Sequence, residues 1–282
     1  MIVVTGATGS IGRELVGLLR AGGAPLRAFV RSAAKGDALG CDYVVGDFDE
    51  PDTVAAALAG ADRLFLNAGG AVPADGAQPM VRQQVAAIDA ARRAGVGLVV
   101  KVSVWGAKPG GKLAEGAHWE IEQHLKASGL DWQILQPSGF MQNFRTGAGS
   151  FTDDGDLIGV HGDSPVSYID CHDIAAVAAA LLTGDGKPGQ TLVLTGPEAL
   201  THTAIAAKLS AAAGREIRYR DLTPAEMADR LAAQGVPRSF VDDVVTLWAE
   251  VAQGSLAGTT DTVRRLTGRP PRTFDQFLAA AG

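Results

Sequence analysis

The first half of the chain alternates between short apolar runs and longer segments with apolar residues at helical spacing. The longer segments repeat an apolar residue every three or four positions, which is the period of an amphipathic helix. Strands that alternate with helices in this way form a parallel sheet covered on both faces, so the pattern predicts the doubly wound α/β class. The apolar runs that predict strands are residues 2–5, 26–30, 43–45, 64–66, 96–102 and 132–135.

The alternation lapses after Pro137, where residues 138–172 are rich in glycine, aspartate and serine. A helix expected at residues 173–182 and a strand expected at residues 191–194 then indicate a return to the sheet. By the usual rule for sheets of this class, the ligand cleft lies at the carboxyl ends of the strands.

The last part of the chain, from Thr201 onward, has mostly helical periodicity. We expect one strand at residues 216–222, and helix starts at Thr223 and Ser239, because these residue types favour the first positions of helices. The predicted organisation is a sheet domain at residues 1–150, completed by about 173–195, and a smaller, mostly helical substrate lobe at residues 151–172 and 196–282.

The composition narrows the classes of partner and location. The chain has 282 residues, 46% of them hydrophobic and 20% charged, which is typical of a globular protein. Its net charge of −6 argues against nucleic acid or an anionic membrane surface as the main partner. No apolar stretch approaches the ~20 residues of a membrane-spanning helix and no targeting segment is visible, so we expect a cytoplasmic protein. Cys41 and Cys171 are too few for a disulfide framework or a four-thiolate zinc site, and we expect no metal.

A glycine-rich loop, Gly6-Ala7-Thr8-Gly9-Ser10-Ile11-Gly12, lies between the first predicted strand and the first predicted helix. Gly6 permits a tight turn, Gly9 lets the backbone approach a pyrophosphate, and Gly12 lets the helix and strand pack closely. The helix N-terminus adds free N–H groups and a partial positive charge. The loop therefore predicts a dinucleotide site of the Rossmann type, the alternative being an ordinary glycine-rich turn. The residues expected to hold the pyrophosphate are Gly6, Thr8, Gly9, Ser10, Ile11 and Gly12.

The residue at the end of the second strand indicates which nicotinamide cofactor is bound. NAD-specific folds place an acidic residue ~20 residues beyond the loop, where it accepts a hydrogen bond from the ribose 2′-hydroxyl. This chain has Arg31 there, with Lys35 nearby, whereas Asp37 comes too late for that role. A cation attracts a 2′-phosphate, so the sequence favours NADP as cofactor, with NADPH preferred over NADH. The alternative is that Arg31 is a solvated residue at a strand end.

Several further motifs are similar to those of one family. The loop resembles the pattern V-T-G-A-T-G-x-x-G of atypical short-chain dehydrogenases/reductases, and the segment from His118 to Gly129 resembles H-x3-E-x2-L-x2-S-G. Residues 132–137 resemble W-T-I-L-R-P, and residues 140–144 resemble F-M-x-N-F. Together these segments resemble the NmrA-like family of NAD(P)-binding proteins, including its NAD(P)H:quinone oxidoreductase-like members, over nearly the whole chain.

The resemblance implies roles for residues that follow the predicted strands. Asp47 matches the acidic residue that this family places beside adenine, and Phe48 is expected to flank adenine with it. The residues expected to border the ribose and nicotinamide are Asn67, Ala68, Ser103 and Pro137. The candidates for an apolar pocket that takes a flat substrate are Trp105, Phe140, Met141 and Phe144, the alternative for the last three being core packing.

The catalytic candidates depart from the typical short-chain dehydrogenase pattern. The Tyr-x-x-x-Lys pair of those enzymes would fall near His118 and Glu122, so their phenolate mechanism is absent here. His118 and Glu122 are four positions apart on a predicted helix, where Glu122 could orient His118 and favour its protonated form as a proton donor. The alternative is an exposed helical ion pair. A second departure is Gln136, which stands where the family usually has arginine.

Three functions are consistent with these residues. The first is an NADPH-dependent reductase that transfers hydride to a small aromatic, quinone-like or carbonyl substrate, with His118 supplying or relaying a proton. The second is an NADP-binding redox sensor without turnover, which the missing Tyr-x-x-x-Lys pair favours. The third is an isomerase or epimerase that retains its bound cofactor. The expected partner is a small molecule, and a homodimer is among the oligomeric states left open.

Overall fold

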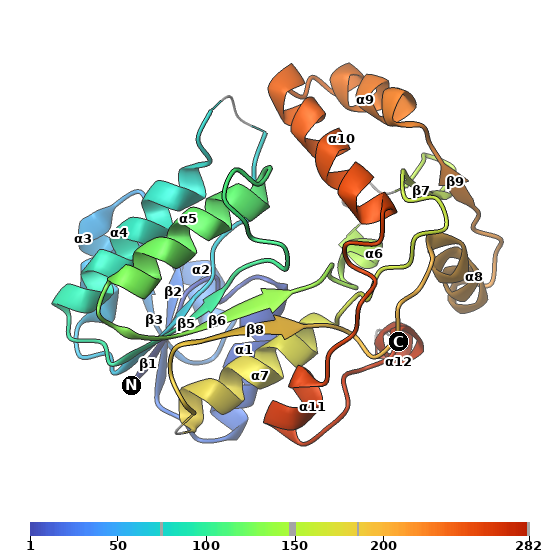
Figure 1. Ribbon diagram of the computed structural model, residues 1–282. Coiled ribbons are helices and arrows are strands. Elements are labelled where there is room, and N and C mark those ends of the chain that lie inside the picture. The colour runs from blue at the N-terminus through green and yellow to red at the C-terminus, as the bar shows by residue number, and fades with distance from the viewer. Residues whose placement is uncertain (74–75, 147–150, 185, 281–282) are drawn as a thin grey trace. The chain divides into compact units, whose positions relative to one another are not determined.

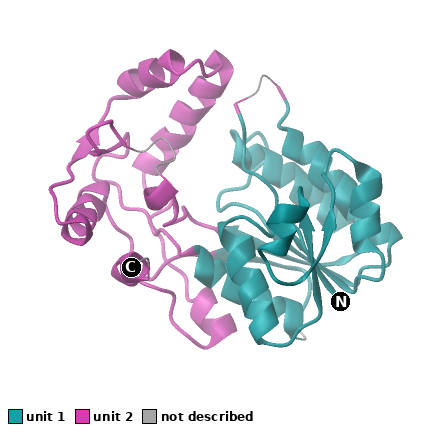
Figure 2. Ribbon diagram, turned by 180° about the vertical axis from the view of Figure 1, so that it is seen from behind, with its two compact units in different colours: residues 1–72, 77–136, 171–193 teal, residues 73–76, 137–170, 194–282 magenta. Residues whose placement is uncertain are grey.

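The computed structural model describes residues 1–73, 76–146, 151–184 and 186–280. The chain divides into two compact units, which Figure 2 distinguishes by colour. The first unit contains residues 1–72, 77–136 and 171–193, and the second contains residues 73–76, 137–170 and 194–282.

The first unit is built on a sheet that has seven strands among the described residues, in the order β3-β2-β1-β4-β5-β6-β8. The hydrogen-bonded pairs among β1 to β6 are parallel. The strand order reverses between β1 and β4, and such a switch point is where ligands bind in open α/β sheets. The strands are β1 (Ile2–Val4), β2 (Leu26–Val30), β3 (Asp42–Val45), β4 (Arg63–Leu66), β5 (Leu98–Val102), β6 (Asp131–Pro137) and β8 (Gln190–Leu194).

Helices cover both faces of this sheet (Figure 1). One layer is formed by α3, α4 and α5, and the other by α1 and α7, which pack against each other. Because both faces are covered, the central strands are apolar almost throughout; Leu64, Val99 and Ile134 are fully buried in the core under α3, α4 and α5. The helices are α1 (Ser10–Ala21), α2 (Ala33–Asp37), α3 (Pro51–Leu58), α4 (Pro79–Arg93), α5 (Ala114–Ala127) and α7 (Cys171–Thr183).

The second unit combines a small parallel sheet with helices. Its strands β7 and β9 pair in parallel. Its apolar core contains Phe144 of α6, Ile205 of α8, and Phe274 and Phe277 of α12. A smaller cluster joins Ile158 to Met227 of α9. The elements are α6 (Asn143–Thr146), β7 (Leu157–Gly159), α8 (His202–Ala213), β9 (Tyr219–Asp221), α9 (Pro224–Ala233), α10 (Arg238–Ala252), α11 (Thr262–Thr267) and α12 (Phe274–Ala279).

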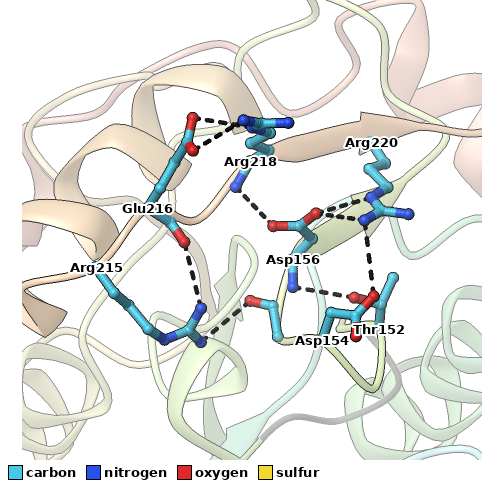
Figure 3. Close-up of polar contacts among 8 residues, drawn as sticks. Thr152, Asp154, Asp156, Arg215, Glu216, Arg218 and Arg220 are labelled. Atoms are coloured by element: carbon cyan, nitrogen blue, oxygen red, sulfur yellow. Dashed lines mark hydrogen bonds and ion pairs between the residues drawn. The ribbon is translucent and has the colours of Figure 1, made fainter.

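One carboxylate links the two short strands of this unit (Figure 3). Asp156, just before β7, accepts hydrogen bonds from the backbone N–H of Arg218 at 3.0 Å and from Nε of Arg220 at 2.8 Å. The backbone N–H of Asp156 in turn donates to the Thr152 hydroxyl at 3.0 Å. The Arg218 guanidinium contacts Glu216 instead, at 2.9 Å for both nitrogen–oxygen pairs. Asp156 therefore ties the turn before β7 to the segment that forms β9.

The predicted α/β class and the alternation of elements are confirmed, with boundary differences of one or two residues for most elements. The sequence did not predict α2, because five residues are too few to show a helical period. Thr223 caps α9 as expected, with Glu226 completing a capping box. The expectation that Ser239 starts a helix was wrong: α10 begins one residue earlier, with Pro237 at its N-cap.

Candidate dinucleotide site

The loop after β1 is held against the end of β4 by hydrogen bonds between the Thr5 hydroxyl and the Asn67 backbone. Thr5 Oγ1 accepts a hydrogen bond from the Asn67 backbone N–H at 2.9 Å, and it lies 2.8 Å from the Asn67 carbonyl oxygen. Gly6 has a positive φ of 60°, and a Cβ added there would lie 2.9 Å from the Asn67 carbonyl oxygen. Both the backbone angle and the close approach require glycine, as the sequence predicts.

The other two loop glycines shape the start of α1. A Cβ on Gly12 would lie 2.1 Å from the Gly6 carbonyl oxygen, so only glycine lets the helix pack this closely on the loop. Gly9 is the N-cap of α1 and carries no capping side chain, which leaves the first N–H groups of the helix available to a ligand. A Cβ on Gly9 would meet only the Gly6 carbonyl oxygen, at 3.4 Å, so close packing within the protein does not require glycine there. The role expected for Gly9, to let the backbone approach a pyrophosphate, stays a prediction.

The loop opens into a cleft of about 540 Å³ at the carboxyl ends of β1, β2, β3 and β4. This is the switch point of the sheet, where the fold class predicts a bound dinucleotide. Most of the residues predicted to contact the cofactor lie together in its wall, although they come from four separate strand ends. They are Gly6, Thr8, Gly9, Arg31, Lys35, Asp47, Phe48, Asn67 and Ala68.

Two cations on the cleft wall are not neutralised by the protein. Arg31, after β2, and Lys35, in α2, are exposed, and within the described ranges neither side chain has an ion-pair or hydrogen-bond partner. The nearby carboxylate of Asp37 accepts a hydrogen bond from the Tyr43 hydroxyl at 2.8 Å and does not line the cleft. The cleft therefore presents positive charge where a 2′-phosphate is expected.

The segment after β3 lines the cleft with Asp47 and Phe48. The Asp47 carboxylate accepts the Asp49 backbone N–H at 3.0 Å, and Thr53 Oγ1 accepts the Asp47 backbone N–H at 3.1 Å. The Phe48 ring packs edge-on against Phe29, with ring centroids 5.5 Å apart. These contacts fix the backbone at the position expected for the adenine.

The predicted catalytic pair is buried. His118 and Glu122 are 7% and 2% exposed, so the alternative of an exposed helical ion pair was wrong. The expectation that Glu122 orients His118 was also wrong, because Nδ1 of His118 hydrogen-bonds Nζ of Lys101 on β5, at 2.8 Å. Glu122 instead accepts hydrogen bonds from Ser103 Oγ at 2.6 Å and Gln136 Nε2 at 2.8 Å.

This burial decides the charge of His118. Removal from water and the neighbouring Lys101 ammonium both lower the pKa of His118 well below its ordinary value of 6.5. Both effects oppose the protonated His118 that the sequence predicts near neutral pH, and they favour the neutral imidazole. Burial also lowers the pKa of Lys101 to about 7, with the Glu122 carboxylate acting against this shift. The pair therefore places a titratable ammonium against a neutral imidazole.

Lys101 is the site residue that sequence reasoning missed. It stands as one charged residue in the apolar run at residues 96–102, which predicts a strand covered on both faces. A lysine in such a run is fully buried unless it lies at an end, and buried lysines are rare and paired. The signal was present, but only the three-dimensional register of β5 against α5 identifies its partner.

The remaining predicted residues have varied surroundings. The Ser103 hydroxyl donates a hydrogen bond to the Glu122 carboxylate, and the Ser103 backbone N–H donates to the Leu135 carbonyl oxygen at 2.7 Å. Pro137 is buried at the end of β6, and Trp105 is partly exposed after β5. Phe140 is partly exposed, whereas Phe144 is buried in the core of the second unit, with its ring edge-on to Tyr168 at 4.8 Å. For Phe144 the structure supports core packing over pocket lining.

Comparison with known proteins agrees with this geometry. Residues 6–185 match the model of a family described as NAD(P)H-binding. The chain belongs to this NAD(P)H-binding family. The matched range includes the glycine loop, the cleft cations and the buried Lys101–His118 pair, and the protein accordingly binds NAD(P)H. The residues of the cleft fit this cofactor, since the loop offers free helix N–H groups and the wall offers unpaired cations.

Three known proteins cover nearly the whole chain. NAD(P)H azoreductase from Xenophilus azovorans is 40% identical over 289 residues, which span 99% of this chain and 97% of that protein. The NADPH-dependent quinone oxidoreductase QOR2 of Escherichia coli, solved with NADPH, is 27% identical, with a TM-score of 0.84 over 100% of this chain and 99% of that chain. A mutant of NmrA is 18% identical, with a TM-score of 0.74 over 98% and 94% of the two chains. This last likeness concerns the fold alone.

Proposed function

We propose that the protein is an NADPH-dependent reductase that transfers hydride to a small aromatic, quinone-like or carbonyl substrate. The observation that carries the choice of cofactor is the pair of unpaired cations, Arg31 and Lys35, on the cleft wall. The relatives that support the choice of reaction act as an azoreductase and a quinone oxidoreductase.

The described residues suggest how the cofactor is held. The N-terminus of α1 and the loop around Gly9 bind the pyrophosphate, because free N–H groups and the helix dipole stabilise negative charge there. Arg31 and Lys35 bind the 2′-phosphate, and Asp47 and Phe48 border the adenine. Bound NADPH supplies a hydride at its nicotinamide ring. Asn67, Ala68, Ser103 and Pro137 stay predictions for the ribose and nicotinamide, as do Trp105 and Phe140 for the substrate.

One further feature favours an acid–base role for this site. A binding protein without chemistry has no need of a buried ammonium beside a buried imidazole, and such a pair is costly to bury. Perturbed titratable groups of this kind gather at functional sites. The buried Lys101–His118 pair therefore favours a reductase over an NADP sensor without turnover. A homodimer and a cytoplasmic location stay predictions; among the described helices none is long and apolar enough to cross a membrane.

The test is a turnover assay with the purified chain. NADPH absorbance is followed after addition of a quinone, an azo dye or an enone, and the cofactor that co-purifies is identified with its redox state. We expect NADPH consumption with at least one acceptor and weakly held cofactor. Tight NADP binding with no consumption across the panel contradicts the proposal and indicates a sensor. Tightly retained, oxidised cofactor without net consumption indicates an isomerase or epimerase.

A further inference from the structure

Lys101 lies in the middle of the buried sheet, so its ammonium depends on a few polar contacts within the protein. In the sheet it pairs with Leu66 of β4 on one side and Ile134 of β6 on the other. Its side chain is fully buried, with 0% exposure. An ammonium removed from water is strongly destabilised unless hydrogen bonds compensate. Here Nζ donates to the Val102 carbonyl at 3.0 Å and contacts Nδ1 of His118 at 2.8 Å.

This contact determines which nitrogen of His118 carries the proton. An ammonium has hydrogens to donate and no lone pair, so Nδ1 of His118 must be the acceptor. In the neutral imidazole the proton then lies on Nε2. Within the part of the chain that the structure describes, no group hydrogen-bonds Nε2 of His118. His118 thus has one nitrogen bound to Lys101 and an N–H free for another molecule.

A neutral imidazole alone is a poor proton donor. Loss of the Nε2 proton leaves an imidazolate anion unless Nδ1 gains a proton at the same moment. In this protein the group that can supply that proton is already hydrogen-bonded to Nδ1. The geometry therefore couples two proton movements through one imidazole ring, the first from Nζ to Nδ1 and the second from Nε2 to an acceptor outside the protein.

We propose that Lys101 and His118 form a two-proton relay to the reduced substrate, an inference that rests on the proposed reductase function. After hydride has formed the new C–H bond, the substrate oxyanion takes the proton from Nε2 of His118. The N–H bond of the Lys101 ammonium breaks as an N–H bond forms at Nδ1, which leaves a neutral imidazole and a neutral amine. A solvent proton that returns to Nε2 drives the Nδ1 proton back to Nζ. Lys101 acts through His118 and is a positioning residue.

The charges around Lys101 set the pH range of this relay. Burial is the main cause of its lowered pKa of about 7, Glu122 on α5 favours the ammonium, and Lys126 on the same helix opposes it. The pKa of His118, which faces Lys101 from α5, is lowered by burial and by Lys101. Because the ammonium is the proton donor, the relay can operate below about pH 7, where Lys101 is mostly protonated. Above that pH Lys101 is mostly the neutral amine and cannot supply the proton.

The first experiment compares matched variants in steady-state turnover. Lys101→Met keeps the shape of the side chain and removes the proton, and His118→Gln keeps an N–H donor but cannot relay. The matched control is His124→Gln, because His124 lies on the same helix in a partly exposed pair with Asp89 at 2.9 Å. We expect both relay variants to lose at least ~10-fold in kcat, with NADPH affinity within twofold, and the control to be unchanged. Loss of the fall in kcat above about pH 7 in Lys101→Met is the readout that a structural role does not produce.

A second measurement tests the same coupling without turnover. Histidine ring nitrogens are followed by NMR from acid to alkaline pH in the parent chain and in Lys101→Met. We expect His118 to be neutral, with its proton on Nε2, in the parent at pH 6, and its pKa to rise when the Lys101 charge is removed. An unchanged His118 titration contradicts the proposal, as does a Lys101→Met variant with parental kcat and pH profile. If no acceptor is reduced by the parent chain, the proposed function fails, and the NMR result alone decides whether Lys101 controls His118.

Discussion

The Cα of Gly12 lies so close to the Gly6 carbonyl oxygen that a Cβ on Gly12 would approach that oxygen to 2.1 Å. This contact seats the first turn of α1 directly on the loop that follows β1. The helix N-terminus is thereby fixed at the switch point of the sheet, where its free N–H groups face the cleft. The spacing of the two glycines in the sequence is therefore a steric requirement of the site.

A methyl group at position 12 should disturb both folding and cofactor binding. We expect Gly12→Ala to lower the free energy of unfolding by ~1–3 kcal/mol, as overpacking does, and to weaken NADPH binding by displacing the loop. The matched control is Gly17→Ala on the same helix, because a Cβ there meets nothing within 4 Å. Replacing that exposed helical glycine should raise stability by ~0.5–1 kcal/mol. Urea unfolding and NADPH titration measure both effects; equal stability of the two variants contradicts the prediction.

The cleft cations should determine the preference for NADPH. A charge-assisted hydrogen bond is worth ~1.5–3 kcal/mol, which is about one to two decades in affinity. We expect tighter binding of NADPH than of NADH, and Arg31→Ala to remove most of the difference. Arg93→Ala, an exposed arginine at the end of α4, is the control and should leave both affinities unchanged. Calorimetric titration of both cofactors is the measurement, and equal affinities in the unmutated protein would refute the role of Arg31.

Two charge changes on α5 should move the pH profile in opposite directions. Glu122→Gln keeps an oxygen for Ser103 and Gln136 but removes the charge that favours the Lys101 ammonium. The fall in kcat/KM at high pH should therefore shift to lower pH. Lys126→Met removes the opposing charge, 3.1 Å from Glu122, and should shift the fall to higher pH. Shifts of the same sign in both variants are incompatible with control of Lys101 by these charges.

The depressed pKa of Lys101 should also appear in the stability of the protein. Below about pH 7 the lysine is charged in both the folded and the unfolded state, so the whole cost of burying the ammonium is present. Between about pH 7 and the ordinary value of 10.5 the folded state binds fewer protons than the unfolded state, so stability rises with pH. We expect this rise in the parent chain relative to Lys101→Met, measured by urea unfolding at several pH values. Parallel curves for the two proteins are the contrary result.

Asp156 should control the acid stability of the second unit. The backbone N–H of Arg218, followed by the Arg220 side chain, lowers the pKa of Asp156 below its ordinary value of 3.8. Its stabilising effect is therefore present above that value and is lost as the pH falls through the lower folded-state pKa. Asp156→Asn should speed amide hydrogen exchange in β7 and β9 at neutral pH. The control is Asp154→Asn, whose carboxylate is 85% exposed and 4.0 Å from Arg220, and it should have no effect.

The sequence was sufficient for the parts of the fold that have a local signal. The hydrophobic period separates strands from helices. The glycine loop marks the switch point, because Gly6 and Gly12 are sterically required there and can be recognised by their spacing in the sequence. The position of Arg31 after the second strand was also enough to place it in the cleft. These features depend on residues near one another in the chain or at the same edge of a parallel sheet.

The acid–base residues could not be assigned in the same way. Helical spacing placed His118 and Glu122 on one face, and that was correct, but it could not say what faces them. The register of β5 brings Lys101 to His118 and Ser103 to Glu122, so each side chain has a partner from another element. Burial then reverses the expected charge of His118. These effects depend on contacts between β5 and α5. The spacing of residues along the sequence does not show which side chains from two different elements meet.

The division of the chain has a consequence for folding during synthesis. The first unit includes residues 171–193, which form α7 and most of β8, although residues 137–170 belong to the second unit. Helix α1, in which Leu15 and Leu19 are buried, packs against α7. A nascent chain that has emerged only to Gln136 therefore carries the complete glycine loop. It lacks α7, so the surface of α1 that α7 covers in the folded protein is still exposed. Chaperone binding and aggregation should be greatest in this interval, before α7 leaves the ribosome.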